Sequence, residues 1–358
     1  MALDFAKEAI QNASTHSINF DELRAGKANI KVIGCGGCGS NMVTWLFNKG
    51  INGATIYACN TDALHLSVTK ADEKILIGKE LTRGLGAGGK PTKGREAAKE
   101  ALVELKKAVG QSDMLFVLAG EGGGTGTGAA PVVAQIAKES GAIVIGVVTM
   151  PFESEKARID KAEFGLQELR DSTDTCIVLD NNRLVDIAGQ LPIEQAFAVA
   201  NELVSTMIKG IVETITLPSL INLDYADVSS IMKDGGVSVI GIGEADSQDR
   251  VNEAVRQALT HPLLDVDYKG ARGALIHVTC GPDLKLEEFD TIGRTVSENL
   301  SPDAQVIIGA RISKDFVGKV RVITIMTGVK SPYVLGKDSG MDKEQVHREM
   351  SDLGIEIL

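Results

Sequence analysis

The sequence lacks several features that would place it in a common class of protein. Its 358 residues include only five cysteines, an odd number that argues against a disulfide framework and favours a reducing compartment. No apolar run approaches the roughly 20 residues that cross a membrane. The first residues also lack the basic-then-apolar order of a signal peptide. We therefore expect a cytoplasmic protein with no direct membrane insertion.

The sequence also lacks an excess of positive charge. The chain has 37 lysines and arginines against 48 aspartates and glutamates, which gives a net charge of −11. An acidic surface repels nucleic acid and anionic lipid, so we expect neither as a direct partner. The hydrophobic content of 44% is typical of a globular protein. The length favours two domains that each bury a core.

Apolar segments alternate with helical patterns along the first half of the chain. Buried strands are predicted at residues 29–34, 54–60, 113–120, 142–150 and 175–181, and a helix is predicted over 95–110. The alternation predicts an α/β fold with a doubly wound parallel sheet that is covered on both faces. The ligand of such a sheet binds at the carboxyl ends of its strands.

The same patterns divide the chain into five segments. We expect an N-terminal extension (1–28), a first α/β domain (29–190), a long central helix and connector (191–222), a second, smaller α/β domain (223–330) and a tail (331–358). The central helix is apolar around most of its circumference, which indicates packing on several sides.

Three glycine-rich loops, at residues 34–41, 84–91 and 120–128, are expected at the ends of strands. Glycine has no Cβ, so backbone N–H groups can approach a ligand closely. Several such groups at a helix N-terminus bind an anion without any lysine. Thr125 and Thr127 add hydroxyl donors. Three such loops at one sheet edge predict a polyphosphate that is held on several sides.

Commoner nucleotide and metal sites fit these loops less well. The first loop matches the dinucleotide fingerprint of an NAD-dependent oxidoreductase, but the second strand does not end in the expected acidic residue. That alternative also leaves the loop at 120–128 without a role. A Walker P-loop is excluded, because no glycine run is followed by Gly-Lys-Ser/Thr. Cys35 and Cys38 have metal-ligand spacing, but no second pair completes a four-ligand site.

A series of motifs, all in the same order, resembles the tubulin superfamily in the form of the prokaryotic FtsZ division proteins. They are GCGGCGSN (34–41), NTDA (60–63), TRGLGAGG (82–89), GGGTGTG (122–128), NNRL (181–184), AFAVAN (196–201) and NLDYADV (222–228). The resemblance spans roughly residues 29–330. The absence of a long linker before the tail favours the archaeal type.

The resemblance implies GTP or GDP in the first domain, with Mg²⁺ held through phosphates and water and not by direct protein ligands. The implied phosphate contacts are Gly36, Gly37, Cys38, Gly39, Ser40, Gly88, Gly124, Thr125, Gly126 and Thr127. On the ribose and base side, the matching residues are Asn41, Glu155, Arg158, Asn181, Phe197 and Asn201. Phe197 and Asn201 lie four residues apart and share a helix face, so one can stack on a base while the other bonds its edge.

Two aspartates follow the central helix. In isolation, Asp224 and Asp227 fit a helix cap or a solvated turn. Hydrolysis of a γ-phosphate needs a positioned water, however, and the predicted cradle supplies no carboxylate for it. In the family, this loop inserts into the nucleotide site of the next subunit. The resemblance thus implies a GTPase that is completed in trans by Asn222, Asp224 and Asp227, in an open head-to-tail filament.

The sequence departs from the family pattern at a few positions. Glu121 replaces an apolar residue, and its carboxylate would weaken GTP binding unless it points to solvent or toward a cation. Glu155 and Arg158 are one residue closer than usual, and Lys90 replaces an asparagine. These changes are compatible with slow turnover or with co-assembly with a second FtsZ-like paralogue.

The remaining features are interpreted more simply. Trp45 is expected to pack in the core, and His277 to lie in the core or at a strand edge. The last residues, GIEIL, fit either a docking peptide for a membrane-tethering adaptor or a frayed end. We expect a GTP-gated filament at the mid-cell division site. The alternatives are the oxidoreductase and a nucleotide-gated assembly regulator that does not hydrolyse.

Overall fold

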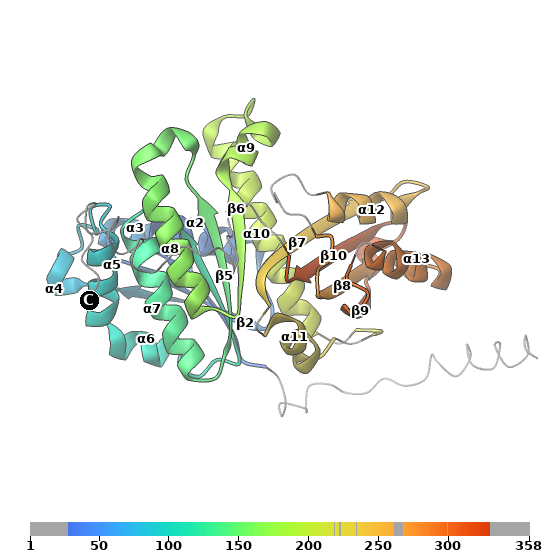
Figure 1. Cartoon of the computed structure of the whole chain (residues 1–358), viewed down its shortest axis with the longest axis horizontal. Helices are drawn as coiled ribbons and strands as arrows, with labels where there is room; N and C mark the ends of the chain where they lie inside the picture. Colours follow the sequence, from blue (N-terminus) through green and yellow to red (C-terminus); the bar gives the residue numbers. More distant parts are fainter. Residues whose placement is uncertain are drawn as a thin grey trace, which may run out of the picture.

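The computed structural model describes residues 28–329, apart from Pro218, Asn222, Asp234, residues 261–267 and Asn299. The predicted N-terminal extension up to residue 27, the tail and one of the three predicted catalytic residues, Asn222, lie outside this part of the chain. Figure 1 shows two α/β regions, with helix α10 (Ile193–Thr216) lying between them.

The first region is built on a parallel sheet. Its strands are β1 (Ile30–Cys35), β2 (Ala54–Asn60), β3 (Glu73–Leu76), β4 (Met114–Gly120), β5 (Ile143–Met150) and β6 (Thr175–Asp180). They lie in the order β3-β2-β1-β4-β5-β6, and every pairing among them is parallel. This confirms the predicted doubly wound fold. Successive strands are added outward from β1 on one side and outward from β4 on the other, so the strand order switches between β1 and β4, and a ligand site is expected at their carboxyl ends.

Helices cover both faces of this sheet (Figure 1). They are α2 (Gly36–Lys49), α3 (Ala63–Val68), α4 (Lys79–Thr82), α5 (Pro91–Glu100), α6 (Leu102–Val109), α7 (Thr125–Glu139), α8 (Ile159–Ser172), α9 (Asn181–Ala188) and the 3₁₀ helix η2 (Glu153–Arg158). One apolar core joins α2 and α10 to the sheet, and a second joins α5, α6, α7 and α8 to the other face. The prediction of a single helix over 95–110 was wrong. The structure has two helices, α5 and α6, because the backbone leaves helical geometry at the buried residue Ala101.

The central helix α10 shares its core with both regions. Val204, Ile208 and Ile211 are buried in the cluster that contains strand residues of the first sheet. Ile323 and Ile325 from the second region belong to the same cluster. Contact on several sides explains why the sequence is apolar around most of this helix.

The second region has a mixed sheet. Its elements are α11 (Tyr225–Met232), β7 (Gly236–Ala245), α12 (Arg250–Leu259), β8 (Gly273–Cys280), α13 (Leu286–Ser297), β9 (Gln305–Ile312), the 3₁₀ helix η3 (Lys314–Phe316) and β10 (Val320–Thr327). Strand β10 is antiparallel to β7 and β8, whereas β8 and β9 are parallel. A short parallel pairing of β6 with β7 joins the two sheets.

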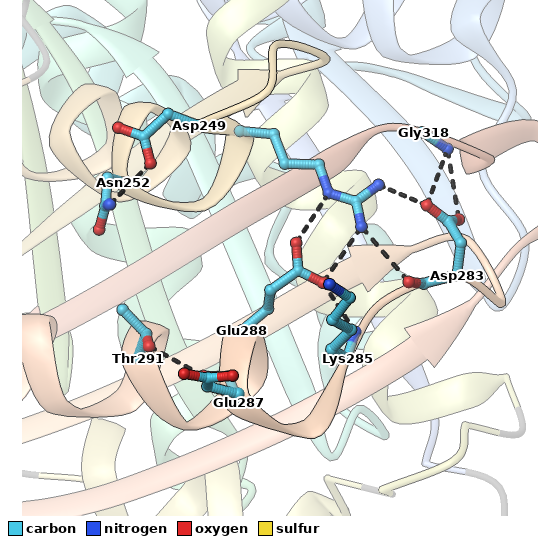
Figure 2. Close-up of polar contacts among 9 residues, drawn as sticks. Asp249, Asn252, Asp283, Lys285, Glu287, Glu288, Thr291 and Gly318 are labelled. Atoms are coloured by element: carbon cyan, nitrogen blue, oxygen red, sulfur yellow. Dashed lines mark hydrogen bonds and ion pairs between the residues drawn. The ribbon is translucent and has the colours of Figure 1, made fainter.

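The guanidinium of Arg250 forms ion pairs that link the loops at one end of this second sheet (Figure 2). Arg250 has only 11% of its side chain exposed and pairs with Asp283 at 2.5 Å and Glu288 at 3.2 Å. Asp283 also accepts a hydrogen bond from the backbone N–H of Gly318, and Glu288 accepts one from Lys285 at the start of α13. Three connections therefore depend on a single, largely buried guanidinium.

Removing this guanidinium tests its contribution to stability. Arg250→Met leaves two carboxylates without their partner, so we expect the free energy of unfolding to fall by about 2 to 4 kcal/mol in urea denaturation. The control is Arg294→Met, whose side chain is 76% exposed and pairs with Asp290 within one helix. That exposed pair should contribute less than about 1 kcal/mol. Equal losses in the two variants would contradict a structural role for the Arg250 cluster.

Candidate nucleotide site

The starts of α2 and α7 lie side by side at the carboxyl edge of the first sheet. Strands β1 and β4 are neighbours, with Cys35 opposite Ala119, and each runs directly into its helix or loop. A Cβ built on Gly36 would lie 2.7 Å from the backbone N of Gly126, which shows how closely the two turns approach. Neither helix, both of them fully described, has an acidic residue in its first turn. The N-terminal ends of both helices, which carry partial positive charge, therefore lie close together, an arrangement that favours anion binding.

The glycines around this point are of two kinds. At Gly39 and Gly126, an added Cβ would meet the carbonyl oxygens of Leu118 and Gly120 at 2.3 and 2.7 Å, so these glycines allow the chain to pack against itself. At Gly37 and Gly88, no described atom lies within 4 Å of an added Cβ. Both glycines are exposed, so the backbone at these positions is open to a ligand.

The predicted phosphate residues all lie around this edge. Gly36, Gly37, Cys38, Gly39 and Ser40 begin α2, Gly124, Thr125, Gly126 and Thr127 begin α7, and Gly88 lies in the loop before α5. Asn41, predicted on the base and sugar side, follows Ser40 on α2. This loop is adjacent to the start of α7, because a Cβ on Gly124 would meet the backbone N of Lys90 at 2.9 Å. The three glycine loops therefore form one cradle.

The two threonines of the signature loop behave differently. Thr125 Oγ1 lies 2.7 Å from Thr61 Oγ1, which ties the start of α7 to the loop after β2. The side chain of Thr127 is fully buried and faces Gly165 of α8, contrary to the expected hydroxyl donor. The cause is the helical repeat: two residues after Thr125, Thr127 points to the other side of the helix. Thr127 can serve the cradle through its backbone N–H.

Glu121 turns into the protein and away from the cradle. Glu121 is only 5% exposed, and both of its carboxyl oxygens lack a hydrogen-bond partner among the described residues. An added Cβ on Gly165 would lie 2.3 Å from Glu121 Oε2, so this glycine makes room for the carboxyl. Burial raises the pKa of Glu121 to about 8. Neither of the two arrangements that would spare GTP binding, solvent or a cation, is the one observed: the carboxyl is buried beside Gly165 of α8, and its raised pKa favours the uncharged form.

The predicted ribose-side residues meet around η2. Glu155 and Arg158 form an ion pair at 2.7 Å, and Arg158 lies against Gly122 of the signature loop. Asn181 begins α9, whose next residue, Asn182, accepts a hydrogen bond from the backbone of Glu153 at 2.9 Å. The short turn therefore connects the signature loop with the start of α9.

The predicted base-side residues project from the first turns of α10. Phe197 is 39% exposed, and its ring lies edge-on to Phe152 with the centroids 6.1 Å apart. Asn201 follows one turn later and is half-buried. The sequence prediction assigned no role to Phe152, although it lies two residues after β5, at the same edge as the glycine loops. The exposed ring and neighbouring amide can bind the face and edge of a planar base.

A cation beside the cradle was also missed. Lys161 on α8 donates a hydrogen bond to the carbonyl of Gly89 at 3.1 Å. Its position depends on the packing of α8 against α7, for which the local sequence contains no signal. Lys90, which replaces an asparagine of the family pattern, is exposed at the start of α5.

Asp224 and Asp227 form a capping box at the start of α11. Asp224 Oδ1 accepts the backbone N–H of Asp227 at 2.8 Å, and Asp227 Oδ2 accepts that of Asp224 at 3.2 Å. Local structure thus confirms the helix-cap interpretation. Tyr225 donates its hydroxyl to the carbonyl of Asp113, the residue before β4. Because β4 has seven residues and ends at Gly120, the aspartates lie about 20 Å from the cradle of their own chain.

The chain matches two family models in tandem. Residues 29–189 match the GTPase domain of the Tubulin/FtsZ family, and residues 236–330 match the C-terminal domain of the FtsZ family. The chain belongs to the tubulin/FtsZ family. Its resemblance to that family is thereby confirmed, and no observation favours the oxidoreductase alternative.

Named members of the family are similar over nearly the whole chain. Cell division protein FtsZ 2 of Halobacterium salinarum is 52% identical over 98% of this chain and 89% of that protein. Cell division protein FtsZ 1 of Archaeoglobus fulgidus is 52% identical over 87% of this chain and 85% of its own length. Both relatives are archaeal, which agrees with the expected archaeal type.

Solved structures agree with the fold. An empty FtsZ dimer of M. jannaschii superposes with a TM-score of 0.79 at 47% identity, covering 94% of this chain and 98% of that chain. A GTPγS-bound protofilament of CetZ2 from Haloferax volcanii has a TM-score of 0.76 at 22% identity, covering 91% and 99%. The second similarity shows the fold alone.

Other site types have little support in the described residues. There, no group of three or more histidines, cysteines, aspartates or glutamates could hold a metal ion. All five cysteines are free, although Cys35 and Cys59 on neighbouring strands bring their sulfurs to 3.3 Å. Within the same part of the chain, no helix is long and apolar enough to cross a membrane.

The buried acid predicts an unusual pH dependence. Folding raises the pKa of Glu121 from 4.5 to about 8, so between these values the folded chain keeps a proton that the unfolded chain releases. Stability should therefore fall as pH rises through this window, by up to about 1.4 kcal/mol per pH unit. Glu121→Gln removes the titration but retains the shape.

The measurement is urea denaturation of both proteins at intervals from pH 5 to about 8. The difference between the variant and the parent should grow steadily in favour of the variant as pH rises, because other groups titrate equally in both. Parallel stability curves would show that the carboxyl is not a buried neutral acid.

Proposed function

We propose that this protein is a GTP-dependent, self-assembling GTPase whose subunits stack head to tail into filaments at the division site. The observation that supports it most strongly is the separation of the cradle from the aspartate pair. The hydrogen bond from Tyr225 to Asp113 fixes this pair at the amino edge of the sheet, opposite the glycine loops. A second subunit can supply what the first subunit holds at its far end.

GTP would lie across the carboxyl edge of the sheet. Its phosphates would accept backbone N–H groups from the open starts of α2 and α7, near Gly37 and Gly88. The ribose would lie beside Glu155 and Arg158, with Asn181 close to the sugar, and the guanine beside Phe197 and Asn201. Mg²⁺ carried by the triphosphate would offset its charge.

Asp224 and Asp227 are well suited to orient a water molecule on a neighbouring subunit. Each carboxylate uses one oxygen in the capping box, which leaves its other oxygen for a water. The cap fixes both side chains before they are inserted, so less conformational freedom is lost when the site assembles. Asn222 is proposed to act with them.

Exposed apolar side chains at both ends support a head-to-tail contact. Leu220 and Ile221, just before the capping box, are 70% and 40% exposed. At the nucleotide end, Leu64 and Leu85 are 79% and 85% exposed, and a bridge between Asp62 and Leu85 joins their loops. Paired burial of such side chains favours association between subunits.

Several finer features of the proposal rest on the family likeness. We propose a cytoplasmic protein concentrated at mid-cell, a second FtsZ-like paralogue as a co-assembling partner, and a membrane-tethering adaptor bound through residues 331–358. Slow turnover would suit co-assembly. A regulator that binds GTP without hydrolysing it remains the competing outcome of the experiment below.

A complementation experiment tests whether the site is shared between subunits. Asp224→Asn keeps an N-cap acceptor but removes the carboxylate, so GTP binding should persist while hydrolysis falls by about a hundredfold or more. Gly37→Asp places a carboxylate where no described atom lies within 4 Å of the added Cβ, so it should exclude phosphates without disturbing the fold. A mixture of the two inactive variants should hydrolyse GTP, because one supplies a nucleotide and the other an intact Asp224.

The controls are samples of each variant alone at the same total protein concentration. Activity of the mixed sample no greater than the sum of these controls would contradict a shared site. Loss of GTP binding in Asp224→Asn would contradict it as well. If the parent protein bound GTP tightly but never hydrolysed it, the assembly regulator would replace the GTPase.

A further inference from the structure

The sole tryptophan of the chain joins the helix of the phosphate cradle to the helix of the base site. Trp45 on α2 donates its indole N–H to Glu202 Oε2 on α10 at 2.8 Å. Lys49, one turn further along α2, pairs with the other oxygen of the same carboxylate. Lys49 also donates to Thr206 Oγ1 at 2.5 Å. We name Trp45, Lys49 and Glu202 the α2–α10 clamp.

The clamp continues a run of contacts between two helices that point the same way. Lys209 donates to the carbonyl of Lys49 at 3.5 Å, and Thr216 donates to the carbonyl of Asn52 just after α2 ends. Successive positions on α2 therefore meet successive positions on α10. The apolar sides of both helices belong to one core. A shift of one helix along the other would break the clamp before it broke this core, because polar bonds depend on direction and apolar contacts do not.

The proposed nucleotide connects the same two helices at their first turns. The phosphate contacts begin at Gly36, at the start of α2, and the base contacts are Phe197 and Asn201 on α10. Glu202 directly follows Asn201, and Trp45 lies one turn beyond Asn41, so the clamp is adjacent to both halves of the site. Clamp and nucleotide are two parallel links between one pair of helices.

The charge of Glu202 suits this position. Partial burial by itself would raise the pKa of Glu202, but hydrogen bonds from Lys49 and Trp45, and the charge of Lys49, outweigh it and lower the pKa. The carboxylate thus stays ionised near neutral pH, where it holds the ammonium and the indole together. Such charge-assisted bonds are shorter and stronger than neutral ones.

We propose that Glu202 is a positioning residue for guanine nucleotides: through Trp45 and Lys49 it sets the spacing between the phosphate cradle on α2 and the base site on α10. This inference rests on the proposed function, since it requires GTP to bridge the two helices. By linkage, a nucleotide that spans both helices should stabilise the clamp as much as the clamp favours the nucleotide. The affinity of a ligand that contacts α2 alone should not depend on the clamp.

Inorganic tripolyphosphate is the probe that separates these cases, because it fills the cradle and has no base. In magnesium-free buffer and below the concentration of assembly, calorimetry gives the affinities of GTP and tripolyphosphate for the parent protein and for Glu202→Ala. We expect the variant to lose about tenfold in GTP affinity while tripolyphosphate affinity changes less than about twofold. Lys49→Met should show the same selective loss, of smaller size.

Trp45 provides a second readout that general destabilisation would not reproduce. In the parent protein, GTP should shift the emission of Trp45 and tripolyphosphate should not, because only GTP constrains the spacing of α2 and α10. Glu202→Ala should abolish the GTP-induced shift at saturating nucleotide. Glu213→Ala is the matched control: it lies on the same helix but pairs with Arg311 of β9 and with Lys209, so GTP affinity and the emission shift should be retained.

Two results would overturn the inference. One is unchanged GTP affinity in a folded Glu202→Ala protein. The other is an equal loss of GTP and tripolyphosphate binding, which would make Glu202 a support of the fold and nothing more. Failure of the proposed function is distinguishable, because then the parent protein itself would not bind GTP.

Discussion

The rigidity of a parallel sheet is the constraint on which the proposed mechanism depends. Backbone hydrogen bonds hold β1, β4 and β5 in register, so the two edges of the sheet cannot approach each other. The glycine loops lie at one edge, and the hydrogen bond of Tyr225 keeps the capped aspartates at the other. No side-chain movement spans about 20 Å, so within one subunit the cradle and the aspartates stay apart. Any chemistry that uses both must join two subunits.

The glycines of the cradle serve the packing of the chain as well as the binding of a ligand. Gly39 and Gly126 are needed where backbones nearly touch, and the contacts they allow bring the two helix starts together. Gly37 and Gly88 leave space above them. Burial of Glu121 against Gly165 removes a carboxylate that would otherwise repel phosphates. The same glycine-rich sequence thus serves chain packing at some positions and ligand access at others.

Features carried by long or periodic patterns could be predicted from the sequence. The five predicted strands are mostly apolar segments, and each is present. The short strand β3 was missed because Glu73 and Lys74 are exposed and it has only four residues. The aspartates three apart correctly indicated a helix cap, since that motif depends on local spacing alone.

Features set by distant partners could not be predicted. The direction of Glu121 depends on Gly165, which lies on another helix, and no local pattern links the two. Trp45 was expected only to pack, because its hydrogen bond to Glu202 joins residues 157 positions apart. The predicted nucleotide-site residues gather around one edge because the doubly wound topology brings their loops there, whereas the predicted catalytic aspartates lie at the other. Which side chains face the cradle was decided by tertiary packing.

The most direct test of a shared active site is the rate of GTP hydrolysis per subunit, measured with Mg²⁺ over a wide range of protein concentration. If the neighbouring subunit completes the site, the rate per subunit is near zero at low concentration and rises above a threshold at which subunits associate. A rate per subunit that stays constant at every concentration would mean that one chain holds a complete site, and would contradict the account.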